Sequence, residues 1–580
     1  PRRGAGLSAA RRTADSPGMP TLVQFGAGNI GRGFIAPVFT AGGWRVVFVD
    51  IDTERIAALH EHGAYTVHEV DNAGQRPVTV RPVDGILASD TAAVQDALVA
   101  ADLVATAVGL GALRHLGANL AAGLTARLAA DRGPLDILVC ENGVQAPRLL
   151  HEAIAAHCEP ELVTRHVALI RTSIGRMIPA NTGGDLLDIR VEPYAHLPIE
   201  ATAFKGPVPQ GVPGLEPRDD FDLVLEQKLY LHNLTHAAIG YLGHLCGCAT
   251  IPDCMELPAI VARARRASDE AIAGMAHTHG HDAASRAAIT RECEQLRDDL
   301  FHRYTNRALA DPVARICRDP FRKLAGDDRL VGAARVCLRQ GITPLALIHV
   351  IRDACRYHPA DDEPRAAEFR ELAEQGWLAV LDATAQLDPK EPLMAATTLA
   401  ERQAEAAAII RKGGNHLRDD EVEAIEIADF GLDRYHEIGL AILVYVNTDR
   451  CCAKELAMTP GMVCPEHTHP PIAGELGKEE TFRVRAGECF LFLPGDDSPE
   501  ARQEALRHLP GDKRDTVTVF RCLHLRQGQQ ATLPPNTLHW FVAGPDGAVI
   551  SEFSTASRDE ADIFTDPAIQ RVPTDGPHAG

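Results

Sequence analysis

The pattern of apolar and polar positions changes twice along this chain of 580 residues, and each change predicts a different kind of fold. From Met19 to about Glu200, short apolar runs alternate with helical stretches, which is typical of a parallel sheet with crossover helices. From about Phe221 to Ile410 helical periodicity dominates, as in the run from Asp222 to Leu245. From about Glu421 short strands return, separated by Gly and Pro turns. We therefore expect an α/β domain, then an all-α domain, then an all-β barrel or jelly roll.

The ends of the chain and the joins between domains follow from the same pattern. Residues 1–18 carry no apolar periodicity, and Met19 stands directly before the first strand, as a natural start would. The arginines in residues 1–18 imitate a transit peptide, but an upstream extension explains them equally well. The segments that we expect are a disordered extension (1–18), an α/β domain (19–205), a helical domain (206–410), a linker (411–420), a barrel domain (421–570) and a tail (571–580).

A glycine-rich stretch directly follows the first predicted strand. Gly26, Gly28 and Gly31 match G-x-G-x-x-G, in which the glycines allow a sharp turn, close approach to a pyrophosphate and close packing of helix on strand. A helix that begins here directs its free N–H groups at the phosphates. The second strand, from Arg45 to Val49, ends in Asp50, whose carboxylate can accept from a ribose 2′-hydroxyl and would repel a 2′-phosphate. The sequence predicts a Rossmann-type domain that binds NAD in preference to NADP.

The amino-acid sequences of these segments resemble those of a known family. The string FGAGNIGRGFI, together with TAVG after one later strand and CEN after the next, resembles the mannitol-1-phosphate 5-dehydrogenases of the long-chain polyol dehydrogenase family. The resemblance extends from Met19 to Ile410 and implies oxidation of a polyol phosphate with NAD as cofactor. The residues that it assigns to cofactor binding are Phe25, Gly26, Gly28, Asn29, Ile30, Gly31, Asp50, Ala107, Val108, Glu141 and Asn142.

The helical region carries the pattern K-x4-N-x2-H, formed by Lys228, Asn233 and His236. At about 100° per residue on an α-helix, Asn233 lies about 140° and His236 about 80° from Lys228, so all three fit one face. The resemblance makes Lys228 the general base, with Asn233 and His236 polarising the substrate oxygen, and desolvation of a buried lysine favours this role. Gly175, where the family carries an acidic residue, leaves a non-phosphorylated polyol open as substrate.

A second chemical pattern lies in the predicted barrel. His467 and His469 form G-x5-H-x-H, Glu480 opens E-x6-G, and His539 closes G-x5-P-x-N-x2-H. These spacings resemble the two cupin motifs, with Asn536 in place of a glycine, an exchange that the tolerance of Asn for positive φ makes mild. Three imidazoles and one carboxylate suit a divalent ion such as Mn²⁺, Fe²⁺ or Zn²⁺.

The stretch HTHPPIAGELGKEETFRVRAGE narrows the resemblance to the D-lyxose isomerase branch of the cupins, over residues 421–567. The resemblance implies aldose–ketose isomerisation with a metal that is often Mn²⁺. Lys478 and Glu552 are then candidates for electrophilic assistance and general base, whereas a solvated lysine and a strand-edge glutamate are the alternative interpretations.

Composition restricts the partners of the chain. With 58 basic and 79 acidic residues the formal net charge is −21, which disfavours nucleic acid. The fourteen cysteines include no C-x-x-C pair and are typical of reduced thiols, and no apolar run reaches the roughly 20 residues needed to cross a membrane. We expect a cytoplasmic enzyme that acts on small sugars.

The leading hypothesis from the sequence is a bifunctional enzyme. It would oxidise D-mannitol 1-phosphate to D-fructose 6-phosphate reversibly, and interconvert D-lyxose and D-xylulose, or D-mannose and D-fructose, in the cupin. The alternative is a dehydrogenase of a non-phosphorylated polyol whose cupin senses sugars or forms a homo-oligomer.

Overall fold

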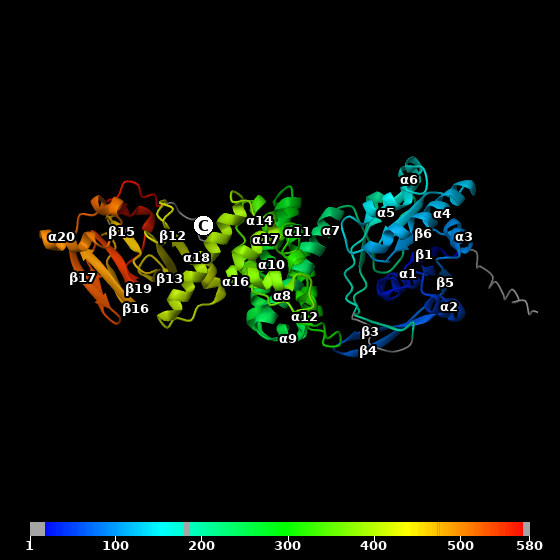
Figure 1. Ribbon diagram of the computed structural model, residues 1–580, viewed down its shortest axis with the longest axis horizontal. Coiled ribbons are helices and arrows are strands. Elements are labelled where there is room, and N and C mark those ends of the chain that lie inside the picture. The colour runs from blue at the N-terminus through cyan, green and yellow to red at the C-terminus, as the bar shows by residue number, and fades with distance from the viewer. Residues whose placement is uncertain (1–17, 179–185, 473, 475, 572–580) are drawn as a thin grey trace, which may run out of the picture. The chain divides into compact units, whose positions relative to one another are not determined.

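The computed structural model describes residues 18–178, 186–472, 474 and 476–571, so the predicted extension and tail lie almost wholly outside the described residues (Figure 1). The chain divides into two compact units. The first runs to Ile342 and includes Ile351–Ala385, and the second combines Thr343–Val350 with the chain from Gln386 onward. Among the described residues, none of the helices has the length and apolar character that crossing a membrane requires.

The first unit begins with a six-stranded parallel sheet, which confirms the predicted Rossmann-type domain. Its strand order is β5-β2-β1-β6-β7-β8. The first strand is central, with β2 and β5 on one side of it and β6, β7 and β8 on the other. In this doubly wound order, ligands bind at the carboxyl ends of the strands where the winding reverses, here between β1 and β6. The strands are β1 Thr21–Phe25, β2 Arg45–Asp50, β5 Val83–Leu87, β6 Leu103–Thr106, β7 Leu135–Val139 and β8 Val167–Arg171.

Helices cover both faces of this sheet, and a buried apolar cluster lies on each side. Acidic N-caps start two of them: Asp52 accepts from Arg55 N (2.9 Å) and Asp90 from Ala93 N (3.1 Å). Smaller sheets, β4-β3-β9 and β10-β11, extend the domain. The remaining elements are a π-helix η1 Gly31–Ile35, α1 Ala36–Ala41, α2 Thr53–His62, β3 Tyr65–Asp71, β4 Gly74–Val80, α3 Thr91–Ala100, η2 Leu110–His115, α4 Gly117–Ala129, α5 Ala146–Ala155, α6 Pro160–His166, β9 Ile189–Val191, β10 Leu197–Glu200, η3 Ala201–Ala203 and β11 Leu215–Arg218.

The following region is helical throughout, which confirms the predicted all-α domain. The predicted run from Asp222 to Leu245 is not one regular α-helix, because a π-helical segment separates α7 from α8. The elements are α7 Phe221–Gln227, η4 Lys228–Asn233, α8 Leu234–Leu245, α9 Ile251–Met255, α10 Pro258–His279, α11 Ala283–Tyr304, α12 Val313–Cys317, α13 Pro320–Lys323, α14 Val331–Arg339, α15 Leu345–Ala354, α16 Ala366–Gln375 and α17 Trp377–Ala385.

The second unit contains the predicted all-β domain. Its strands follow the order β12-β13-β14-β19-β15-β20, and the long β16 pairs with β17, β18 and β19. The elements are α18 Pro392–Lys412, α19 Asp419–Glu423, β12 Glu426–Ala428, β13 Leu440–Asn447, β14 Cys452–Met458, β15 Val463–Thr468, β16 Glu480–Leu493, α20 Pro499–Leu506, η5 Gly511–Thr516, β17 Arg521–Arg526, β18 Gln530–Leu533, β19 His539–Ser554, η6 Asp559–Ala561 and β20 Ile563–Phe564.

Helix α18 packs against the strands of the second unit. Ala406, Ala407 and Ile410 on this helix are buried in one apolar cluster with residues of the barrel such as Val484 and Ile550. Gln403, also buried, donates to the backbone carbonyls of Glu423 (2.8 Å) and Ile425 (3.0 Å) just before β12. The sequence pattern placed this helix at the end of the helical domain, whereas the described contacts join it to the barrel.

Candidate active sites

The glycine-rich turn after β1 has the geometry that its sequence predicts. Gly26 has φ +96°, and a Cβ there would stand 2.3 Å from the carbonyl oxygen of Ala107 at the end of β6. A Cβ on Gly31 would stand 2.1 Å from the Gly26 carbonyl oxygen, so η1 can pack on β1 only without a side chain. Gly28 has no neighbour within 4 Å of such a Cβ, which leaves its backbone open to a ligand.

Asp50 lies at the carboxyl end of β2 and is bonded to the same turn. Its Oδ2 accepts from Ala27 N (2.6 Å) and its Oδ1 from Asp52 N (3.0 Å). On the other side, Ala107 N donates to the Phe25 carbonyl (2.8 Å). The ends of β1, β2 and β6 are therefore joined around the glycines, and the half-buried Asp50 carboxylate stands beside the expected ribose position.

Glu141 closes the neighbouring crevice at the end of β7. Its two carboxylate oxygens accept from Val108 N (2.8 Å) and Gly109 N (2.9 Å), and burial raises its pKa despite these bonds. Of the other predicted cofactor residues, Asn29 and Asn142 are exposed, and Ile30, Ala107 and Val108 are half-buried. All the predicted cofactor residues thus lie along one edge of the sheet, at the ends of four strands.

The K-x4-N-x2-H pattern lies on η4 and the start of α8. The geometry of a regular α-helix, assumed from the sequence, does not apply here because Lys228–Asn233 is π-helical. A π-turn pairs residues five apart, which brings Lys228 and Asn233 over one another instead of about 140° apart. π-Turns are frequent at functional sites. His236 follows one turn later on α8.

Lys228 is half-buried, and its side chain forms no hydrogen bond or ion pair among the described residues. Burial, together with the positive charges of Arg303 and Arg329, lowers its pKa to about 7, against the opposing charge of Glu192. A lysine in this state can take up a proton near neutral pH, which a solvated lysine cannot.

His236 is held by its surroundings in the helical domain. Its Nε2 lies 3.2 Å from Asp311 Oδ2, and its ring stacks on Tyr304 with the centroids 4.9 Å apart. Burial lowers the pKa of His236, and Asp311 opposes this shift. Asp311 and Tyr304 therefore hold the imidazole in one orientation. Asn233 is half-buried at the junction of η4 and α8.

A buried ion pair that no sequence pattern predicted acts on Lys228 through its charges. Arg303 donates to both oxygens of Glu192 (2.6 and 2.9 Å) and to the Gly175 carbonyl (2.6 Å). The Tyr194 ring lies 3.9 Å from the guanidinium, and a Cβ on Gly175 would stand 3.0 Å from that ring. The unusual Gly175 therefore makes room for Tyr194. No local signal could reveal this pair, because its partners are 111 residues apart.

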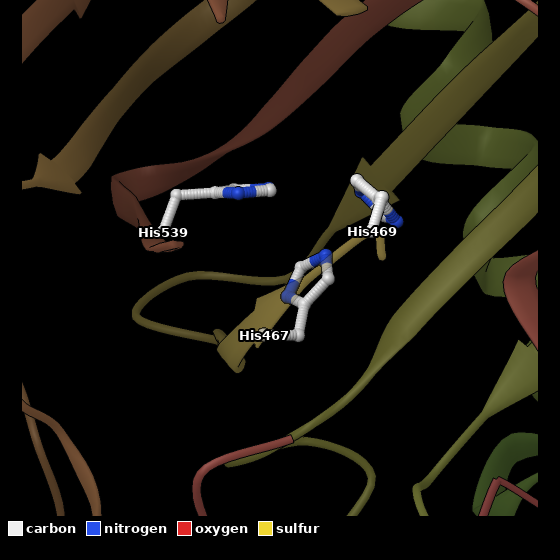
Figure 2. Close-up of side chains that lie close together, drawn as sticks. All are labelled: His467, His469 and His539. Carbon is white, nitrogen blue, oxygen red and sulfur yellow. The ribbon is translucent and has the colours of Figure 1, made fainter. Parts of the chain in front are cut away.

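The four predicted metal ligands converge in the barrel. His467 lies in β15 and His469 follows directly after its last residue, His539 begins β19, and Figure 2 shows the three imidazoles turned towards a common centre. One nitrogen from each ring lies within 4.8 Å of the others. Glu480, the first residue of β16, places Oε1 3.2 Å from both His469 Nε2 and His539 Nε2. Asn536, just before His539, has φ +60°, which confirms the expected positive φ.

The remaining hydrogen bonds of these side chains fit a metal ion. Nδ1 of His467 and of His539 lies 2.8 and 2.9 Å from a backbone carbonyl two residues earlier, and Nδ1 of His469 lies 2.5 Å from Asp562 Oδ1. The Nε2 atoms of His469 and His539 and Oε1 of Glu480 are buried, and although Oε1 lies 3.2 Å from each Nε2, none of the three forms a hydrogen bond of adequate geometry among the described residues. Such orphaned atoms are costly unless a ligand engages them, and a divalent cation suits this donor set.

Lys478 and Glu552 lie beside these ligands and are both buried. Lys478 Nζ is 2.9 Å from Glu480 Oε2 and 3.0 Å from Glu552 Oε1, so neither side chain is solvated. Two further groups, which the sequence analysis missed, complete the cluster: Lys454 pairs with Asp559 (2.5 Å), and Asp559 lies 3.8 Å from Lys478. The cavity beside them, about 40 Å³, is lined among others by Phe430, Leu440, Ile442, Phe482, Phe541 and Phe564.

Comparisons with known proteins divide the chain in the same way. Residues 20–211 match the model of the mannitol dehydrogenase Rossmann domain, residues 220–404 the mannitol dehydrogenase C-terminal domain, and residues 414–575 D-lyxose isomerase. A mannitol-1-phosphate 5-dehydrogenase of Paenarthrobacter aurescens is 33% identical over 66% of this chain and 99% of its own. A D-lyxose ketol-isomerase of a Thermofilum species is 50% identical over 30% of this chain and 94% of its own. The crystal structure of a substrate-free D-sorbitol dehydrogenase covers 70% of this chain and 94% of its own, with a TM-score of 0.53 and 17% identity, and shares the fold.

Proposed function

This chain belongs to the mannitol dehydrogenase family through its first two domains and to the D-lyxose isomerase family through its last, and from this premise we propose two linked activities. The first domains would oxidise D-mannitol 1-phosphate to D-fructose 6-phosphate with NAD, reversibly. The barrel would interconvert an aldose and a ketose with a bound divalent metal. The chain as a whole is thus a polyol dehydrogenase joined to a sugar isomerase, and the proposal concerns their substrates and cofactors.

The dehydrogenase proposal depends above all on Lys228. Its Nζ is unpaired among the described residues and has a pKa of about 7, so it can accept the proton of the reacting hydroxyl. Asn233 and His236 would hold the same oxygen, and the contact of His236 with Asp311 supports a fixed orientation of its ring. NAD, when bound, supplies the acceptor for the hydride that leaves the carbinol carbon. The open backbone at Gly28 and the carboxylate of Asp50 support this cofactor and the preference for NAD over NADP.

A kinetic comparison tests the polyol. We expect kcat/KM with NAD to be much higher for D-mannitol 1-phosphate than for D-mannitol, in keeping with the substrate named for the Paenarthrobacter relative. Equal or better turnover of free mannitol would replace the phosphorylated substrate with a free polyol. D-Glucitol 6-phosphate is a matched control, because it carries the phosphate but differs in the configuration of one carbinol.

The isomerase proposal depends on His467, His469, Glu480 and His539, which would hold the metal. Mn²⁺ is the metal that we favour, with Zn²⁺ and Fe²⁺ as alternatives, and a bound ion would supply Lewis-acid polarisation of the substrate oxygens. Glu552 would move the proton between C1 and C2. Its carboxylate is buried and forms an ion pair with Lys478, which also pairs with the second oxygen of Glu480.

Proton exchange at C2 tests the isomerase. We expect metal-loaded protein without nucleotide to exchange the C2 proton of D-lyxose or D-mannose with solvent, or to form D-xylulose or D-fructose. Glu552→Gln should abolish the reaction without releasing the metal. If the metal binds but no aldose, free or phosphorylated, reacts, the barrel is a sugar-sensing or oligomerising module instead.

A further inference from the structure

A segment near the end of the described chain, Ser557–Thr565, lies against β15, which carries His467 and ends directly before His469; we call this segment the C-terminal clamp. Asp562 Oδ1 is 2.5 Å from His469 Nδ1. The Phe564 ring stacks on the His467 ring, with centroids 5.4 Å apart and 29° between the planes. The C-terminal clamp therefore touches both histidines, His469 at its Nδ1 atom and His467 on the face of its ring.

Backbone and side-chain bonds fix this segment at both of its ends. Within the clamp, β20 pairs antiparallel with β15, so its register places Phe564 opposite His467. At the last residue of the clamp, directly after β20, Thr565 N donates to the Glu466 carbonyl (3.0 Å). At its start, the Asn447 side chain exchanges two hydrogen bonds with the backbone of Ser557 (2.9 and 3.1 Å). The position of Asp562 is thus determined by the fold rather than by an exposed loop.

His469 depends on this segment in a way that the other two histidines do not. His467 and His539 use backbone carbonyls two residues away, which come with their own strands. The acceptor for His469 is a side chain 93 residues further along the chain. A carboxylate on Nδ1 fixes the tautomer with Nε2 free, stops rotation of the ring and raises the basicity of Nε2.

We propose that Asp562 is a positioning residue for metal binding, and that the C-terminal clamp thereby determines how tightly the barrel retains its metal. The inference rests on the metal site proposed above. Asp562 does not ligate the metal itself. Its carboxylate holds the His469 ring in place before the metal binds, so that less conformational entropy is lost on binding. Its negative charge also lies close to the bound cation.

Metal affinity of the full chain tests the proposal. We would measure Mn²⁺ and Zn²⁺ binding by competition with a chromophoric chelator for the wild type, Asp562→Ala, Asp562→Asn and Glu560→Gln. Asp562→Ala should weaken binding about 10- to 100-fold. Asp562→Asn should lose less, because its amide oxygen still accepts from Nδ1. Glu560→Gln is the matched control, since it removes an exposed carboxylate of the same segment, and it should bind like the wild type.

Two further measurements separate positioning from a general structural role. Thermal unfolding of the metal-free variants should match that of the metal-free wild type, and NAD reduction by the polyol should be unchanged in all of them. Wild-type metal affinity in Asp562→Ala would overturn the inference. Equal losses of metal affinity in Asp562→Ala and Asp562→Asn would also overturn it if the metal-free forms of both variants unfold at a lower temperature than the metal-free wild type. A wild type that binds neither metal would instead overturn the metal site itself.

Discussion

Lys228 illustrates how neighbouring charges and burial decide the chemistry of a single side chain. Desolvation disfavours its charged form, and the Arg303–Glu192 pair adds a positive and a negative charge whose effects on Lys228 oppose each other. A lysine in the same sequence pattern on an exposed helix would stay protonated at neutral pH. The proposed role as a base is therefore a property of the folded site.

Replacing Lys228 tests that role directly. Lys228→Ala should lower kcat for polyol oxidation about 10²- to 10⁴-fold, because the base is lost, while NADH binding remains. Stopped-flow turnover and NADH fluorescence titration measure the two effects. Lys390→Ala, which removes an exposed lysine, is the control and should leave both unchanged. Near-normal turnover in Lys228→Ala would show that another group takes the proton.

The pKa of Lys228 also predicts a pH dependence. Oxidation needs the neutral amine, so its kcat/KM should fall about tenfold per pH unit below about pH 7 and level off above it. Reduction of the ketose needs the ammonium form, so its rate should fall as the pH rises above about 7. Profiles measured in both directions over pH 5.5–9 check this. An oxidation profile whose acid limb lies near pH 10 would contradict the assignment.

Asp50 should determine the choice of dinucleotide. Asp50→Asn removes the negative charge but keeps an acceptor for Ala27 N, so the preference for NAD over NADP should narrow. Asp50→Ala also loses that hydrogen bond, and it should weaken binding of both dinucleotides. Dissociation constants for NADH and NADPH distinguish the effect of charge from that of the turn. A wild type that prefers NADP would refute the assignment of Asp50.

At the scale of elements, irregular helices and one long helix matter most. The π-helical segment η4 begins at Lys228 and ends at Asn233, and a π-turn pairs residues five apart, whereas a regular helix would place these two about 140° apart. Helix α18 covers the barrel with Ala406, Ala407 and Ile410. Its apolar face belongs to the core of the second unit, so the barrel should depend on residues that precede its strands.

A substitution on α18 tests this dependence. Ile410→Ala should destabilise the barrel unit by about 2–5 kcal/mol, because it leaves a cavity in the buried cluster. Calorimetry would follow the unfolding transition that added metal stabilises. Val444→Ala, at a strand position 44% exposed, should cost less than about 1 kcal/mol. A shift of a metal-insensitive transition alone would assign α18 to the other unit.

At the scale of the whole molecule, the chain carries two predicted sites that share no residue. Each predicted dehydrogenase residue lies in the first compact unit, and each predicted metal ligand in the second. Neither set of residues needs the cofactor of the other, so the two activities should respond separately to loss of a cofactor.

Chelation tests this separation. Treatment with EDTA should stop aldose–ketose exchange and leave NAD reduction by the polyol unchanged, and His467→Ala should have the same selective effect. Restoring Mn²⁺ should recover exchange in the wild type but only weakly in the variant. A dehydrogenase that also loses activity in EDTA would show that its own site needs a metal.

The sequence by itself determined the fold classes and the residues of both motifs. Apolar periodicity is local, and the residues of K-x4-N-x2-H or H-x-H stay near one another in the fold because only a few residues separate them along the chain. The glycine pattern likewise predicted the turn at Gly26, since only a residue without a side chain fits beside Ala107.

Tertiary structure decided what surrounds those residues. Arg303 and Glu192 meet across 111 residues, and Asp562 reaches His469 across 93. The pairing of Lys454 with Asp559 and the packing of α18 on the barrel also join distant segments. No periodicity or motif links such partners, because the free energy that brings them together comes from burying whole elements. The sequence thus predicts which groups react, whereas the fold determines their orientation, their pKa values and their hold on a metal.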